Sequence, residues 1–501
     1  YGIFVFNRLK AVQEFCDVKV IAPLQWFPFM SHLRRSAPVT KIKTYQKKDG
    51  LDVFYPRFFS IPKYFKWLDS VFYFLSILPI IYYLKKNENF DFDIIDVHWT
   101  YPDILSGYLL SKIFRKKFIV TIRGKEALYL DESTLRKAIL TYCLKRAHAV
   151  VCLSDELKNL VENLGVEEKQ INIIHNGVDT NVFNFKDQLT ARKKLNLPDD
   201  KKILVSVGSL IKRKGHHELI KALSAIQDRP DIELYIIGGV NPEGDYSNEL
   251  LALVQSLQLN NVHFISSVDH ETLSYWYAAS DLFCLATSGE GCPNVVLEAL
   301  ACGCPVVVSN VGAVPDIVRP GVDGLIVEPQ QWSWVENISS AFNQKWDRPL
   351  IAEHMKDMGW STCAENVVDQ YQAVLTPEKR VEQKLNIIYH HRTLGDGAEG
   401  IHIREMVAAF RALGHHVQVV GPAGESVPEK DGPSRLSKIK ALLPGVVFEL
   451  CEVGYSVYSF AQLSWLIVTK KPDFIYDRYI TFNVGGVLAA KIFKTPLFLE
   501  V

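Results

Sequence analysis

The chain has 501 residues, of which 48% are hydrophobic and 22% are charged, with 56 basic and 56 acidic side chains. This composition excludes a disordered or collagen-like chain and allows about three folded domains. The balanced charge gives no electrostatic support for nucleic-acid binding. Nine cysteines without the spacing of a disulfide framework favour a reducing compartment, so we expect a cytoplasmic protein.

The charge is nevertheless uneven along the chain. Residues 1–90 carry 14 basic and six acidic side chains. A solvated basic face accounts for this excess as well as a surface for anionic lipid or an anionic acceptor does. The apolar stretch 71–84 has 14 residues, fewer than the ~20 needed to span a bilayer. It predicts a core or interfacial helix, and we expect peripheral contact with the inner membrane face through residues 63–86.

Short apolar strands alternate with longer helical stretches, a pattern typical of parallel α/β layers. The first group of strands is predicted at residues 17–23, 92–99, 117–124, 148–154 and 171–179. After "NLPDDKK" the pattern restarts, with strands at 203–209, 233–239, 261–268, 281–288, 305–310 and 324–329. We therefore predict two Rossmann-like, doubly wound parallel-sheet domains at residues 1–185 and 186–358, the first of them without its first strand.

A partial third Rossmann-like domain is predicted behind a helix at 359–375 and a charged linker at 376–384. Residues 385–422 have the pattern of a strand, a glycine loop, an amphipathic helix and a second strand. Residues 1–23 have the same helix and second strand. We therefore predict that residues 385–501 are a truncated second copy of the first domain, and that the chain is a part of a longer tandem protein.

Two acids flank a predicted helix start in "SGEGCPNVVLEALACGCPVVVS", residues 288–309. Pro293 suits the first helical position, which predicts a helix over Asn294–Cys302 and a buried parallel strand after it. Glu290 then lies in the loop before the helix and Glu298 lies inside it. Because a carboxylate among apolar side chains is costly to bury alone, we expect a polar group at this helix N-terminus.

A second loop, in "VSVGSLIKRKGHHELIKAL" at 205–223, places Arg213 and Lys214 just before a helix. Two cations beside a helix N-terminus suit a diphosphate, whose charge grows as it leaves during a reaction. Taken alone, the loop is equally well a solvated basic turn.

Gly395, Gly397 and Gly400 form a G-x-G-x-x-G pattern between a strand and a helix. The next strand ends in Gly421 and Pro422, where a dinucleotide site needs an acid for the ribose. We therefore disfavour a nicotinamide or flavin site, and expect these glycines to let backbone N–H groups approach an acceptor or phosphate.

Metal binding has little support in the sequence. "DFD" at 91–93 resembles the D-x-D of metal-dependent sugar transfer, but it is far in sequence from the basic loop. Cys302 and Cys304 straddle a helix end and a buried strand, so packing explains them better than a metal does. We predict no metal site.

The segment "EGCPNVVLEALACGCPVVVSNVGAVPDIV" at 290–318, with "VGSLIKRKG" and "HNGVD" at 175–179, resembles glycosyltransferase family 4. The two acids match the E-x7-E of this family of retaining nucleotide-sugar transferases with GT-B fold. The resemblance covers nearly all of residues 1–375, and its N-terminal half recurs at 385–501. It implies an acceptor-side first domain, a nucleotide-sugar-binding second domain and a helix at 359–375 that crosses back to the first.

The resemblance also implies the reaction. A hexose-type sugar would pass, with retention, from a nucleotide diphosphate donor to a hydroxyl acceptor, lipid-linked or polysaccharide, in polysaccharide or glycolipid biosynthesis. No carboxylate is obviously placed as a covalent nucleophile, which favours attack on the face that the leaving group departs from. No metal requirement is expected.

The matching residues receive roles from the resemblance. Glu298 would bind the ribose hydroxyls, Glu290 the donor sugar, and Arg213 with Lys214 the β-phosphate of the leaving nucleoside diphosphate. The other donor-side positions are Gly208, Ser209, Val268, Gly291, Cys292, Pro293, Asn294 and Val295, with the backbone of Val268 touching the base. The acceptor-side positions are Gly2, His98, Arg123 and Glu126.

Two positions depart from the family pattern. Ser209 stands where the family often has Arg, and we expect Arg213 to supply that charge. Arg123 stands where many members have His, which argues against a catalytic histidine there.

Other functions stay open at this stage. The chain would also fit a non-catalytic nucleotide-sugar-binding or assembly module, or an inactive fragment of a tandem enzyme. A dinucleotide oxidoreductase built on 385–501 and a nucleotide-sugar epimerase of the same fold are further alternatives.

Overall fold

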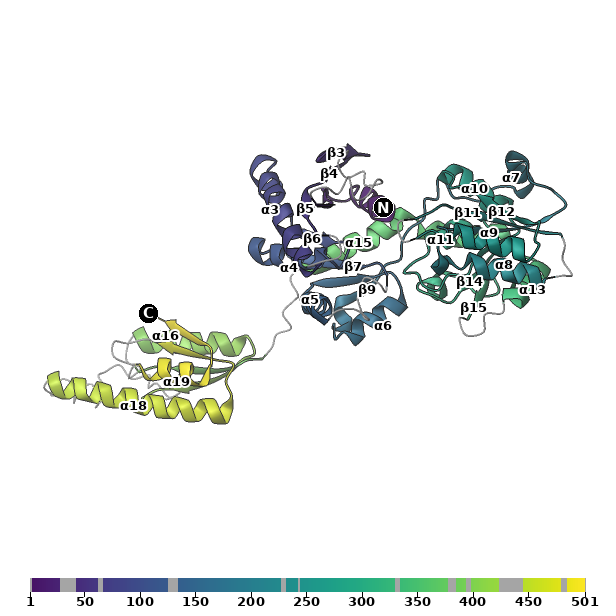
Figure 1. Cartoon of the computed structure of the whole chain (residues 1–501). Helices are drawn as coiled ribbons and strands as arrows, with labels where there is room; N and C mark the ends of the chain where they lie inside the picture. Colours follow the sequence, from purple (N-terminus) through teal and green to yellow (C-terminus); the bar gives the residue numbers. More distant parts are fainter. Residues whose placement is uncertain are drawn as a thin grey trace. The chain divides into compact units, whose positions relative to one another are not determined.

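The computed structural model describes residues 2–27, 42–61, 66–124, 134–226, 231–241, 244–328, 334–376, 384–392, 398–422, 445–478 and 484–500. It consists of two compact units, Tyr1–Thr376 and Pro377–Val501 (Figure 1). The larger unit contains two α/β domains, which we call the first domain (1–185) and the second domain (186–358). We call the smaller one the C-terminal unit.

The first domain contains a four-stranded parallel sheet and two smaller sheets. The sheet has the order β6(Ile94–Val97), β7(Lys117–Ile122), β8(Ala149–Cys152), β9(Ile171–Ile173). A separate sheet joins β1(Lys19–Ile21) to β4(Leu51–Phe54) and β3(Tyr45–Lys48), and β2(Leu24–Trp26) pairs with β5(Arg57–Phe59). Its helices are α1(Ile3–Val12), α3(Asp69–Asn87), α4(Asp103–Phe114), α5(Thr134–Leu144) and α6(Asp155–Asn163). The five predicted strands are present, whereas β2 to β5 escaped prediction because they are short and partly polar.

The second domain has one continuous parallel sheet of six strands. Their order is β12(Val262–Ile265), β11(Ile232–Ile237), β10(Lys202–Val207), β13(Leu282–Leu285), β14(Val306–Ser309), β15(Gly324–Val327). The helices are α7(Gln188–Leu195), α8(His216–Ala225), α9(Ser247–Ser256), α10(His270–Ala279), α11(Asn294–Ala301), α12(Val314–Ile317), α13(Trp334–Asn343) and α14(Arg348–His354). The central strands β13 and β14 are fully buried, as expected for a sheet covered on both faces. All six predicted strands are confirmed.

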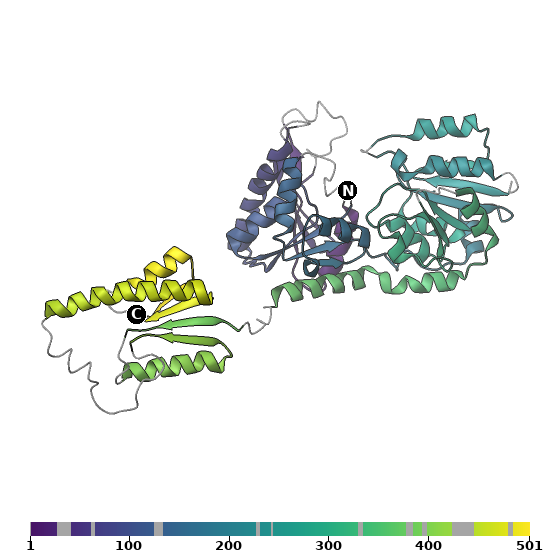
Figure 2. The ribbon, with the colours of Figure 1, turned by 90° about the horizontal axis from the view of Figure 1, so that it is seen from below.

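The helix predicted at 359–375 is α15(Trp360–Leu375). It packs on α1 of the first domain, and its buried residues Cys363, Ala364 and Val367 share a core with Val12 and β7 and β8 residues. Figure 2 shows α15 leaving the second domain and running along the first.

The C-terminal unit has a four-stranded parallel sheet with the order β17(His416–Val420), β16(Asn386–His390), β18(Phe474–Arg478), β19(Leu497–Glu500). Its helices are α16(Ala398–Ala412), α18(Gly445–Lys470) and α19(Gly485–Phe493). Gly395 and Gly397 and most of the linker lie outside the described residues, and Gly400 is buried in α16.

Helix α3 is longer than the apolar stretch that predicted it. With the short 3-10 helix Lys66–Leu68 before it, it is the one helix of the described chain that is long and apolar enough to cross a membrane by length and composition. Its buried side chains, among them Tyr73, Ile77 and Ile81, pack on Phe58 and Leu110. This packing agrees with the predicted core or interfacial helix.

Candidate active site

The basic loop and the acidic loop of the second domain meet at the carboxyl ends of neighbouring strands. The basic loop follows β10, and the acidic loop follows β13, which is paired with β10. Lys214 Nζ lies 2.6 Å from Glu290 Oε1, and Arg213 Nη1 lies 3.3 Å from the same oxygen. Arg213 also donates to the Gly289 carbonyl, at 2.8 Å. The structure therefore brings together the three predicted catalytic residues, although Glu290 is 76 or more positions from the two cations.

Glycines allow the basic loop to pack so closely. Gly215 has a φ of +74°, and a Cβ there would lie 1.8 Å from the Ala286 carbonyl oxygen at the end of β13. Gly208 lies against the stem of Lys214, which an added Cβ would approach to 3.4 Å. Lys214 is held in this space with 16% of its side chain exposed, so a charge placed beside it is only partly screened.

Helix α11 places the second acid. It begins at Asn294, with Pro293 as the residue before the first turn rather than in it, and Gly303 follows its end with a φ of +72°. Glu298 lies inside the helix with 9% exposure, and Tyr277 Oη of α10 donates to its Oε2 at 3.0 Å. Burial raises the pKa of Glu298 to about 7, although the Tyr277 hydrogen bond lowers it.

In the first domain, a polar chain starts from α15 and crosses the end of the sheet. Tyr371 Oη donates to Asp96 Oδ2 at 2.6 Å, and the same oxygen lies 3.1 Å from His98 Nε2. Arg123 Nη2 donates to His98 Nδ1 at 2.9 Å. Burial raises the pKa of Asp96, but His98 and Arg8 lower it more, so that it is well below its usual range. Asp96 is therefore a buried carboxylate that is contacted at Oδ2 by Tyr371 and His98, whereas its Oδ1 has no hydrogen-bond partner among the described residues.

Burial determines the protonation states of His98 and Arg123 in this polar chain. Burial lowers the pKa of His98 more than Asp96 raises it, so the imidazole is neutral at neutral pH. With Nδ1 accepting from Arg123, its proton lies on Nε2, toward Asp96. Burial also lowers the pKa of Arg123, to about 9, which leaves the guanidinium charged at pH 7.

The polar chain of hydrogen bonds continues from the first domain into the second domain. Arg123 Nη1 donates to Asn176 Oδ1 at 3.4 Å, and Asn176 Nδ2 donates to Asn294 Oδ1 at 2.9 Å. A Cβ on Gly291 would lie 2.0 Å from the Arg123 carbonyl oxygen. The start of α11 is therefore hydrogen-bonded to, and in close backbone contact with, the predicted acceptor side.

The remaining predicted positions are more scattered. Ser209 Oγ accepts from Asn241 Nδ2 at 3.1 Å, and Val268 lies after β12, partly buried against the main core. Cys292 is buried, and Val295, in the first turn of α11, packs on the same core. Gly2 is exposed before α1 with a φ of +84°. Glu126 lies outside the described residues.

The acids of the D-x-D segment are engaged elsewhere. Asp91 pairs with Lys85 and Lys116, and Asp93 Oδ1 lies 3.9 Å from Lys116. Cys302 and Cys304 are buried free thiols in the core, as the packing interpretation expected. Within the described ranges, no three His, Cys, Asp or Glu side chains are grouped as metal ligands.

Two family models match the two domains in turn. Residues 17–182 match the model described as Glycosyltransferase Family 4, and residues 187–359 match Glycosyl transferases group 1. Both models describe glycosyltransferases, and the chain is a glycosyltransferase. It is an enzyme that transfers a glycosyl group from a nucleotide sugar, and it has the GT-B fold of two Rossmann-like domains.

Named relatives of this glycosyltransferase agree with the assignment. The chain is 25% identical over 309 residues to the N-acetyl-alpha-D-glucosaminyl L-malate synthase of Bacillus anthracis, covering 61% of this chain and 76% of the relative. It is 26% identical over 370 residues to TuaC of Bacillus subtilis, named for teichuronic acid biosynthesis, covering 71% and 88%.

Solved structures share the fold of this glycosyltransferase. Sucrose-phosphate synthase from Thermosynechococcus elongatus has a TM-score of 0.61 at 21% identity, over 74% of this chain and 93% of that one. Anabaena HepE in complex with UDP and glucose has a TM-score of 0.56 at 18% identity, over 74% and 95%.

Sequence reasoning did not assign Tyr277, Tyr371, Asn176 or Asp96 to this site. Tyr277 and Tyr371 gave no signal, because a tyrosine in an apolar helix is usually a core residue. Asn176 lies in the "HNGVD" that supported the resemblance, but its contact with Asn294 spans 118 positions.

Proposed function

We propose that the enzyme transfers a hexose-type sugar, with retention, to a hydroxyl acceptor in polysaccharide or glycolipid synthesis. The contact of Lys214 and Arg213 with Glu290 carries this proposal. Two cations beside one carboxylate leave a net positive charge, which a diphosphate compensates. The carboxylate, in turn, can accept hydrogen bonds from the hydroxyls of the attached sugar.

The donor residues have separate roles in the proposed complex. Glu298 accepts from the ribose hydroxyls, and the start of α11 presents backbone N–H groups to the phosphates. Glu290 holds the sugar, and Lys214 and Arg213 hold the β-phosphate. Ser209 and the Val268 backbone line the nucleotide side.

The reaction itself breaks the bond from the anomeric carbon to the β-phosphate oxygen. The acceptor oxygen forms its bond to that carbon on the same face, and its proton goes to the departing phosphate. The charge that grows on the phosphate is stabilised by the Lys214 and Arg213 side chains. Since these two cations take the part of a divalent metal, we propose a metal-independent transfer, which EDTA should leave unchanged.

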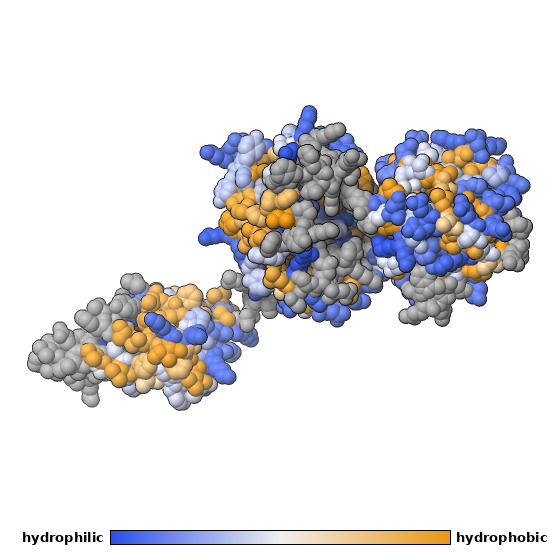
Figure 3. All heavy atoms as spheres, in the orientation of Figure 1, coloured by the Kyte–Doolittle hydropathy of each residue, from blue (hydrophilic) through white to orange (hydrophobic). Residues whose placement is uncertain are grey.

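The acceptor is proposed to bind against the first domain, along His98 and Arg123, opposite Gly291 of the donor loop. A lipid-linked or polysaccharide acceptor fits the exposed apolar residues of α3, which include Leu75, Tyr82 and Tyr83. Figure 3 shows hydrophobic residues on the face that carries α3. Lys85 and Lys86 in its last turn would meet anionic headgroups at the inner membrane face.

For the C-terminal unit, we propose that it is a second copy of the first domain. The support is the shared order of elements, since α16 and β17 correspond to α1 and β1, and β18 and β19 to β6 and β7. In the copy, β16 lies between the strands that correspond to β1 and β6.

Turnover of a Lys214→Ala variant of the full chain tests the proposal. Losing one preorganised donor to developing charge costs ~3–4 kcal/mol of barrier, so the variant should be about 10²–10³-fold slower. Lys212→Ala is the matched control, because Lys212 is an exposed lysine of the same loop and its loss should leave the rate within about twofold of the wild type. Equal turnover of Lys214→Ala and the wild type would refute the diphosphate assignment.

A further inference from the structure

Tyr277 of α10 is the hydrogen-bond partner of the Glu298 carboxylate. The donor–acceptor distance is 3.0 Å, and both side chains are buried. The tyrosine ring packs against Phe283 and Phe183, with ring centroids 5.6 and 6.1 Å away. The hydroxyl is therefore held at one place beside the acid.

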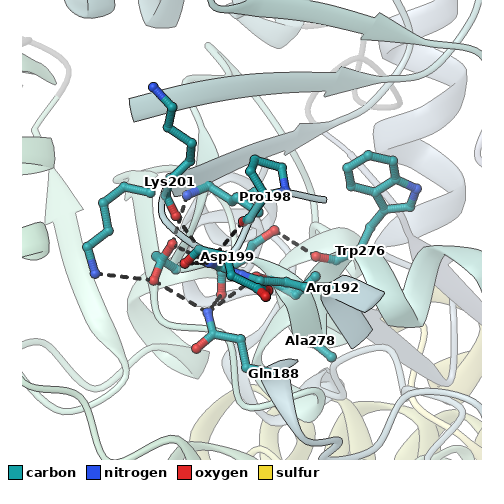
Figure 4. A network of polar contacts seen from close by, with 12 residues as sticks. Gln188, Arg192, Pro198, Asp199, Lys201, Trp276 and Ala278 are labelled. Atoms are coloured by element: carbon teal, nitrogen blue, oxygen red, sulfur yellow. Dashed lines mark hydrogen bonds and ion pairs between the residues drawn. The ribbon is translucent and has the colours of Figure 1, made fainter. Parts of the chain in front are cut away.

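The backbone around Tyr277 is fixed as well. Arg348 of α14 donates to the carbonyls of Ala278 and Ser280, at 2.8 and 2.6 Å. Arg192 Nε of α7, which is buried, donates to the Ala279 carbonyl at 3.0 Å. Figure 4 shows Arg192 and Gln188 in this polar network, next to Trp276 and Ala278 of α10. The end of α10 is thereby anchored from two other helices.

We propose that Tyr277 is a positioning residue for the donor: it occupies Oε2 of Glu298 and leaves Oε1 for the ribose hydroxyls of the nucleotide. This inference rests on the proposed function of Glu298 as the ribose ligand. Tyr277 itself touches neither the sugar nor the reacting atoms in this scheme. It acts through Glu298.

Burial of Glu298 makes nucleotide binding depend on pH, and the Tyr277 hydrogen bond reduces this dependence. An ionised carboxylate accepts hydrogen bonds only, whereas a protonated one uses one oxygen as a donor. Burial raises the pKa of Glu298 to about 7, and the Tyr277 hydrogen bond lowers it, so removing the hydroxyl raises the pKa further. A smaller fraction of Glu298 is then ionised at neutral pH, and the nucleotide binds more weakly.

The thiols around α11 stay protonated near pH 7. Burial raises the pKa of the Cys302 and Cys304 thiols to about 12, and it raises that of Cys284 on β13 well above its ordinary value. The cationic side chains near the end of the helix are Lys186 and Arg348. Among these carboxyl and thiol groups, Glu298 is the one whose pKa lies near 7.

The test is calorimetric titration of the full chain with UDP and with GDP, from pH 6 to pH 9, for the wild type and Tyr277→Phe. The variant keeps the packed ring and loses only the hydroxyl. For each nucleotide, we compare the dissociation constant of Tyr277→Phe with that of the wild type. The titration of the nucleotide's own terminal phosphate affects both constants equally and cancels in their ratio. Tyr275→Phe is the matched control, because Tyr275 is on the same helix but lies beside Lys194 and Lys186.

We expect Tyr277→Phe to bind about fivefold more weakly at pH 7, with the ratio falling toward one at pH 9, if the pKa of Glu298 rises by about one unit. The kcat at saturating donor should stay within about twofold of the wild type, since a positioning role acts on KM. Tyr275→Phe should match the wild type throughout. Glu298→Gln should remove the excess pH dependence with or without Tyr277.

A ratio near one at pH 7, a ratio that does not vary with pH, or a loss confined to kcat would overturn the assignment of Tyr277. Persistence of the excess pH dependence in Glu298→Gln would overturn it too. A wild type that binds neither UDP nor GDP would overturn the proposed function, and this inference with it.

Discussion

The two domains of the larger unit contribute to the site in different ways. In the second domain, two loops after neighbouring strands of one continuous sheet bring Arg213, Lys214 and Glu290 into contact. In the first domain, the polar residues belong to a chain of contacts that begins on α15 and ends at Asn294. The second-domain part of the site is formed by two neighbouring loops. The first-domain part is assembled from segments that are far apart in the sequence.

This difference teaches where each part of the function is determined. The donor loops can form wherever the strand order of the second domain is right, because each loop connects a strand directly to its helix. The polar contacts of the first domain depend on how α15 and the loop 175–179 pack against it. We therefore expect variants of the donor loops to affect chemistry, and variants of the polar chain to affect the alignment of the domains.

We expect the largest effect from Gly291→Ala. Gly291 lies where the donor loop of the second domain contacts the first domain. An added Cβ would lie 2.0 Å from the Arg123 carbonyl oxygen, so the donor loop and the acceptor side must move apart. A displacement of this order should lower kcat/KM by about 10²-fold or more. Gly289→Ala is the matched control in the same loop, because nothing lies within 4 Å of its added Cβ. Equal losses in the two variants would show that the contact with Arg123 is not responsible.

Asn176→Ala tests the polar chain by itself. The variant removes the hydrogen bonds of Asn176 to Asn294 and Arg123 at a buried position, while Arg123 keeps its bond to His98, and the loss costs about 1–3 kcal/mol. We expect kcat/KM about tenfold lower, with nucleotide affinity within about threefold of the wild type, since the donor loops are intact. The exposed Asn184→Ala serves as the control. A large loss of nucleotide affinity in Asn176→Ala would contradict the division between the two sides.

Glu298→Gln sharpens the comparison on the donor side through stability. In the folded protein the pKa of Glu298 is raised to about 7, above the 4.5 of an unperturbed glutamate side chain. Because the folded state binds more protons in between, the free energy of unfolding falls as pH rises from about 4.5 to 7. The amide avoids this loss.

At pH 8 we expect the apparent Tm of Glu298→Gln to exceed that of the wild type by about 2–4 °C for each kcal/mol of unfolding free energy that the substitution restores. At pH 5 the difference in Tm should be much smaller. Thermal scans at the two pH values measure this. A variant that is less stable than the wild type at both would contradict the raised pKa of the buried acid.

The sequence was sufficient for the parallel strands, because each is an apolar run bounded by turn residues. It also predicted the donor loops, because Arg213 and Lys214 stand just before a helix and Glu290 and Glu298 match the E-x7-E of glycosyltransferase family 4. It did not predict β2 to β5, which are three or four residues long, or the place of Pro293 before the first turn of α11. The contacts of Tyr277, Asn176 and Tyr371 depend on packing between segments 21 to 275 residues apart, which no local pattern encodes.

The central claim is that Lys214 and Arg213 bind a diphosphate beside Glu290. Its most direct test is the ratio of affinities for a nucleoside diphosphate and the matching monophosphate, UDP against UMP or GDP against GMP, in the wild type and in Lys214→Ala. We predict at least about a tenfold preference for the diphosphate in the wild type and its near disappearance in Lys214→Ala, with Lys212→Ala unchanged. A wild type without the preference, or a Lys214→Ala variant that retains it in full, would contradict the account.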